Sequence, residues 1–99
     1  MNRKELYAKA VELRTKSGPI GAMITAIDEA DIALKNALCY LSIFAVAQQA
    51  SADKNDYTAP NAEGSVKMAV AYANAGAKLD TLFMTLAVML EQMGIEVSY

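Results

Sequence analysis

The sequence predicts an all-α fold, in which a short N-terminal helix precedes a long antiparallel helical hairpin that assembles into an oligomeric helical bundle. Nineteen of the 99 residues are alanine, the strongest helix former. Apart from Gly21 and Gly76, the glycines and prolines lie at three breaks in the chain, at 18–19, at 51–64 and at 94. Apolar residues make up 55% of the chain, more than the core of a small monomer needs. We therefore expect one domain over residues 1–99 that associates with itself.

The first helix is predicted over residues 2–16. Leu6, Ala10 and Leu13 fall on one stripe, and charged residues occupy the other face. Lys16 in the last turn and Gly18 just beyond it are typical of a helix C-terminus.

The second helix is predicted over residues 19–50, because Pro19 suits a first helical turn. Asp31 interrupts its apolar stripe, and we expect it to pair with Lys35 one turn later. Residues 37–47 are apolar on every side, and a helix of that kind is normally buried on every side. We expect several helices to surround it, with Cys39 as a small core residue.

The third helix is predicted over residues 61–93, after a loop at 51–60 and before an extended tail at 94–99. Its apolar face is expected to contain Val66, Ala69, Ala73, Gly76, Leu79, Phe83, Leu86, Leu90 and Met93. Met84 and Met89 are also expected in the core. A two-helix hairpin leaves each apolar face half covered. The faces 37–47 and 66–93 therefore predict a homo-oligomer, a dimer or higher.

The composition argues against catalysis and metal binding. The chain has no histidine, so the commonest general base and metal ligand are missing, and it has a single cysteine. We expect no catalytic residue, no metal and no cofactor. No signal-peptide pattern is visible in the first residues, and the longest strongly apolar run is about half of what a bilayer requires. A cytoplasmic protein with no membrane span is expected.

The charge distribution points to one candidate ligand site. Residues 1–18 hold five cations against two acids, and the remaining chain holds four cations against nine acids. This acidic body makes DNA an unsuitable partner. A helix N-terminus attracts anions, and glycines allow close approach of a ligand. The candidate ligand-binding residues are Tyr7, Arg14, Lys16, Ser17, Gly18 and Gly21.

Two functions follow from these observations. The first is a non-enzymatic interaction protein, an adaptor or inhibitor, that acts as a homo-oligomer and binds another protein. The alternative is an oligomer that binds or sequesters a small phosphorylated ligand, such as a signalling nucleotide, at the start of the second helix.

Overall fold

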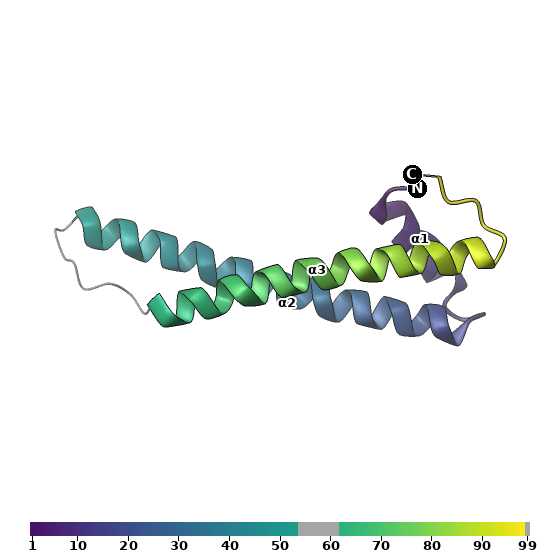
Figure 1. The fold of residues 1–99 in the computed structure, drawn as a ribbon, viewed down its shortest axis with the longest axis horizontal. Helices are drawn as coiled ribbons and strands as arrows, with labels where there is room; N and C mark the ends of the chain where they lie inside the picture. The colour runs from purple at the N-terminus through teal and green to yellow at the C-terminus, as the bar shows by residue number, and fades with distance from the viewer. Residues whose placement is uncertain (54–61, 99) are drawn as a thin grey trace.

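The computed structural model describes residues 1–53 and 62–98, which form the helices α1 (Arg3–Leu13), α2 (Gly18–Asp53) and α3 (Ala62–Gln92). The all-α prediction is confirmed, since the described residues contain no strand. Figure 1 shows α2 and α3 side by side, with α1 and both chain termini at one end. Of the expected loop, residues 51–53 continue α2, and the rest lies outside the described residues.

A capping box starts α1. The Asn2 side chain accepts from the Glu5 backbone N–H at 2.8 Å, and Glu5 Oε1 accepts from the Asn2 N–H at 3.3 Å. The helix ends at Leu13, three residues before the expected end. The N–H groups of Lys16 and Ser17 both turn back to the Leu13 carbonyl, at 3.0 and 3.1 Å. This tight turn lets α2 begin at Gly18.

The end of α3 is a Schellman motif. The Gly94 N–H donates to the Glu91 carbonyl at 2.9 Å, and the Ile95 N–H donates to the Leu90 carbonyl at 3.0 Å. Gly94 has a φ of 83°, a conformation that glycine adopts without steric cost. The motif turns the tail back, so that Val97 packs against the core.

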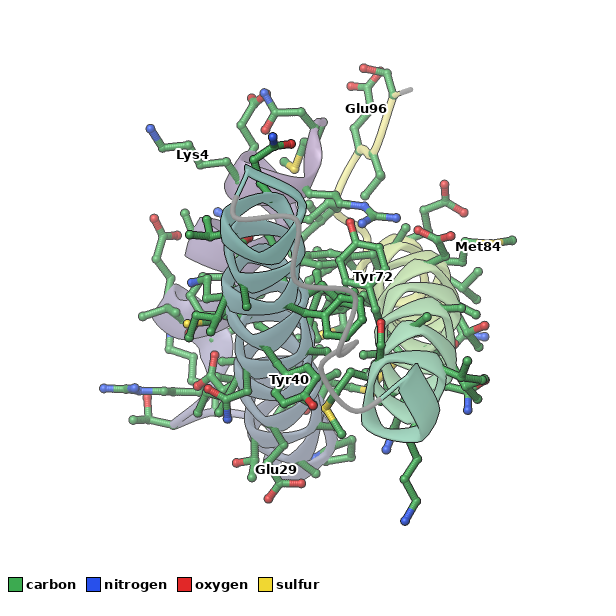
Figure 2. All side chains as sticks on the ribbon, turned by 90° about the vertical axis from the view of Figure 1, so that its left-hand side faces the viewer. Lys4, Glu29, Tyr40, Tyr72, Met84 and Glu96 are labelled. Atoms are coloured by element: carbon green, nitrogen blue, oxygen red, sulfur yellow. The ribbon has the colours of Figure 1, made fainter. Side chains whose placement is uncertain are left out.

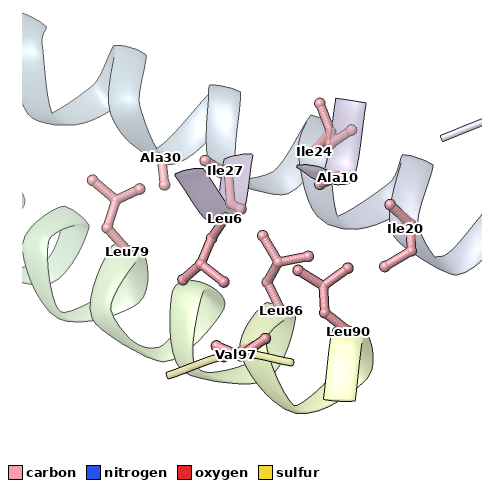
Figure 3. Packing of buried hydrophobic residues seen from close by; sticks show 11 residues of the cluster. Leu6, Ala10, Ile20, Ile24, Ile27, Ala30, Leu79, Leu86, Leu90 and Val97 are labelled. Atoms are coloured by element: carbon pink, nitrogen blue, oxygen red, sulfur yellow. The ribbon is translucent and has the colours of Figure 1, made fainter. Parts of the chain in front are cut away.

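The core lies at the end of the molecule where α1 crosses α2 and α3. All three helices and the tail contribute buried residues to it: Leu6, Ala10, Ile20, Ile24, Ile27, Ala30, Leu79, Leu86, Ala87, Leu90 and Val97. Figure 3 shows Leu6 of α1 reaching between the other two helices. Burying a side chain of this size is worth about 1.5–3 kcal/mol, so α1 is held mainly by its apolar stripe.

The other part of the helix pair has no such core. No described residue of α2 beyond Ala37, and none of α3 before Ala75, is buried; we call these two stretches the distal half. The molecule measures 61 × 23 × 17 Å, and its radius of gyration is 18.6 Å. A compact chain of this length has a radius of gyration of about 13 Å. The excess comes from two long helices that lie against each other alone (Figure 1).

Candidate functional site

The turn between α1 and α2 holds five of the six sequence-predicted ligand residues, but its polar groups are largely used by the chain itself. Ser17 Oγ accepts from the Ile20 N–H at 3.4 Å, and the Ser17 carbonyl accepts from the Gly21 N–H at 3.1 Å. Pro19 has no N–H to offer. A Cβ on Gly21 would lie 3.6 Å from the Arg14 carbonyl oxygen, so the backbone that approaches this glycine closely belongs to the preceding turn.

The N-terminal cations do not converge on this turn. Arg3 lies at the opposite end of α1, where its guanidinium bonds Asp80 of α3 and stacks 5.1 Å from the centre of the Phe83 ring. Lys9 pairs with Glu12 at 3.2 Å. Arg14 and Lys16 remain exposed beside the turn, without an ion pair to any described residue. Binding of a phosphorylated ligand here stays a prediction that rests on two cations.

Tyr7 lies in a groove between the three helices, away from the N-terminus of α2. Its hydroxyl donates to Asp28 Oδ1 at 2.8 Å. That hydrogen bond raises the pKa of Tyr7 above its usual value, with smaller contributions from burial and from the charge of Asp28. The groove has a volume of about 520 Å³ and an apolar floor. Its lining residues are Arg3, Lys4, Tyr7, Ile27, Asp28, Asp31, Leu34, Leu79 and Phe83.

Four polar side chains that line this groove, those of Arg3, Tyr7, Asp28 and Asp31, are already paired. Tyr7 bonds Asp28, Arg3 bonds Asp80, and Asp31 pairs with Lys35 at 2.7 Å, as expected from their spacing. Within residues 1–53 and 62–98, no cluster of three or more acids and cysteines could hold a metal ion. Two of these pairs, Tyr7 with Asp28 and Arg3 with Asp80, join α1 to the helix pair.

The outer face of α2 is apolar and uncovered. We call the five residues at alternating steps of four and three the outer seam: Ile32, Asn36, Cys39, Ile43 and Val46. Ile43 is 64% exposed and Val46 is 70% exposed. The expectation that Cys39 is a core residue is wrong for the single chain, where its side chain is exposed. The face toward α3 is marked by Ala37, which is buried, and the seam lies on the opposite side.

A second apolar line follows α3. We call it the outer stripe, formed by Val66, Val70, Ala73, Ala77, Met84 and Val88. Helical periodicity predicts Val66 and Ala73 on the same face as Leu79, but only Leu79 faces the core. Met84, also expected in the core, is 67% exposed, and Figure 2 shows it pointing away from α2. Met93 is likewise exposed, whereas Met89 packs against the core.

The hydropathy of α2 is high enough to suit a membrane. The stretch Gly18–Ala47 is long and apolar enough to cross a bilayer by length and composition, and 11% of its most apolar window is buried. The core helix of a soluble protein and a signal sequence can have the same length and composition. The expectation of no membrane span stays a prediction.

No protein-family profile, curated protein or solved structure matches the chain.

Proposed function

We propose that this protein is a small non-enzymatic interaction protein of adaptor or inhibitor type, built as an antiparallel helical hairpin that works as a homo-oligomer. The observation that carries the proposal is an uncovered apolar surface, formed by the outer seam of α2, which runs from Ile32 into the distal half, and by the part of the outer stripe on α3 before Ala75.

The amount of surface supports a partner of substantial size. The chain exposes 6700 Å². A folded monomer of 10.6 kDa exposes about 5,500 Å² on the usual scaling, so the excess is about 1,200 Å² per chain. Two chains that hide this excess would bury about 2,400 Å², which lies in the range of obligate homodimers.

The lack of charge on the α2 part of this surface favours a second copy as the partner. The sequence has no charged residue between Lys35 and Asp53. Charged residues are depleted from the centre of protein interfaces, and homodimer interfaces are the more apolar ones. A neutral apolar face is also compatible with itself, whereas a strongly charged face would repel its own copy.

The proposal is tested by the mass of the purified protein in solution. Light scattering after size exclusion, and sedimentation equilibrium at micromolar concentration, should give a multiple of 10.6 kDa. A mass of 10.6 kDa by both methods would overturn it. Addition of anionic and neutral vesicles in a flotation assay should leave the protein unbound; co-flotation would assign the apolar face to a bilayer instead.

The alternative function is addressed by calorimetric titration with inorganic phosphate and with nucleotides. We expect no saturable binding, because Ser17 and the preceding turn occupy donors at the start of α2. Saturable binding that the double variant Arg14→Ala, Lys16→Ala removes would favour the ligand-binding function over the one proposed.

A further inference from the structure

The outer seam has the spacing of a coiled-coil interface. Its residues follow steps of four, three, four and three, which is the spacing of the a and d positions in a heptad repeat. Four of the five are apolar or weakly polar, and Asn36 is the single amide among them. All five side chains are exposed, so a second helix can reach each of them. Over 15 residues the seam is about 22 Å long, at about 1.5 Å per residue.

We propose that two copies of this chain pair along the outer seam as a parallel two-stranded coiled coil, with each seam residue against its own counterpart. The inference rests on the proposed self-association and names the surface that performs it. A two-fold axis is the commonest symmetry of homo-oligomers and makes the interface complementary to itself. The seam is part of the exposed apolar surface whose extent argues for a second copy as the partner.

Asn36 decides the direction of pairing. In a parallel arrangement its amide meets the amide of the other copy, so the carbonyl oxygen of one accepts from the NH₂ of the other. In an antiparallel arrangement centred on Cys39, Asn36 would face Ile43 of the other copy and lose its partner. A single Asn at an a position fixes the register of parallel coiled coils at some cost in stability.

Negative charge limits the seam at its N-terminal end. Glu29 occupies the next heptad position before Ile32, and Asp28 lies beside it. Parallel pairing past Ile32 would bring these acids against their own copies, so we place the start of the contact at Ile32. Between Ile32 and Val46 the only cation is Lys35, which Asp31 neutralises at 2.7 Å.

Disulfide cross-linking tests the pairing directly. Cys39 is the one cysteine of the chain, and mild oxidation of the wild type should give a reducible dimer. In a Cys39→Ser background, Ile32→Cys alone and Val46→Cys alone should each cross-link to their own copies. Val88→Cys in the same background, on the outer stripe of α3, is the control and should not cross-link.

The cross-linking pattern also contains the results that would overturn the inference. Antiparallel pairing would give a dimer only when the Ile32→Cys and Val46→Cys proteins are mixed. Pairing through α3 would cross-link Val88→Cys and leave the seam cysteines free. A wild type that is an oligomer by mass but shows either pattern refutes the parallel seam and leaves the proposed function standing. A monomeric wild type refutes both.

A pair of charge substitutions gives an independent readout. Ile43→Glu, on the seam, should convert the dimer to a 10.6-kDa species, and its circular dichroism should keep the helical content of the wild type. Val88→Glu makes the same chemical change at a comparable exposure on α3 and should leave the dimer intact. Dissociation by Val88→Glu with no effect of Ile43→Glu would place the interface on α3.

Discussion

The hydrogen bond between Tyr7 and Asp28 links the N-terminal helix to α2 at the rim of the groove. Tyr7 Oη donates to Asp28 Oδ1 at 2.8 Å, and this bond is the largest cause of the raised pKa of Tyr7. Ionisation of the phenol would remove the donated proton and set two negative charges side by side. The bond therefore stabilises the fold while the phenol is protonated, and its contribution is lost as the pH rises through the raised pKa.

Tyr7→Phe should lower the free energy of unfolding at pH 8 by less than about 1 kcal/mol, since the bond lies near the surface. The difference from the wild type should shrink as the pH is raised beyond 10, where the wild type loses the same bond. Urea unfolding at several pH values measures both effects. Tyr72→Phe, at an exposed tyrosine without a hydrogen bond to a described residue, is the control and should show no difference at pH 8. A difference at Tyr7 that does not depend on pH would contradict the assignment.

Near the core, helix α3 has apolar residues on both sides, but those on the inner side are buried and those on the outer side are exposed. Leu86 is 0% exposed and packs in the core, whereas Val88, two residues later, is 52% exposed. Their side chains project about 200° apart around the helix, since each residue turns by about 100°. The apolar character of the two side chains therefore does not show which one is buried.

Leu86→Ala should lower the free energy of unfolding by about 2–5 kcal/mol, because it leaves a cavity in the closely packed core. Val88→Ala should change it by less than about 0.5 kcal/mol. Chemical denaturation followed by circular dichroism measures both. Similar losses at the two positions would mean that Val88 is as well covered as Leu86.

Two glycines of the C-terminal part should respond to alanine in opposite directions. Gly76 lies inside α3, where an added Cβ would meet Leu34 Cδ1 at an ordinary 3.9 Å. Gly76→Ala should therefore stabilise the protein by about 0.5–1 kcal/mol. Gly94 has a φ of 83° in the Schellman motif, so Gly94→Ala should destabilise it by about 1 kcal/mol or more. Thermal unfolding of the two variants distinguishes them by the sign of the change in melting temperature.

On the scale of the whole molecule, stability is divided between a packed end and an uncovered end. The core lies where α1 crosses the helix pair, and the distal half has no buried described residue. If a second copy covers the distal half, association and folding are coupled by mass action. The stability of the protein then depends on its own concentration.

The melting temperature should rise by several degrees over roughly a hundredfold increase in protein concentration, because each tenfold step adds about 1.4 kcal/mol to a two-chain equilibrium. Ile43→Glu should have a lower melting temperature that does not change with concentration. Differential scanning calorimetry at several concentrations measures both. A constant melting temperature for the wild type would contradict assembly through this half.

Much of the fold could be predicted from local chemistry. Gly18 and Pro19 predicted the start of α2, Gly94 predicted the end of α3, and the spacing of Leu79, Leu86 and Leu90 predicted the face that is buried. The pairing of Asp31 with Lys35 followed from their separation of one turn. These features depend on residues within a turn or two of each other, so the local sequence is sufficient to predict them.

The tertiary structure decided which apolar faces are covered and where the cations lie. Helical periodicity shows which residues share a face, but it does not show how many neighbours the helix has. One neighbour hides only the side of α2 that holds Ala37, so Cys39 and Ile43 are exposed, although the sequence around them is apolar on every side. In the same way, the bond between Arg3 and Asp80 joins residues 77 positions apart and takes Arg3 away from the expected anion site. Long-range packing sets both outcomes, since the local pattern is compatible with either.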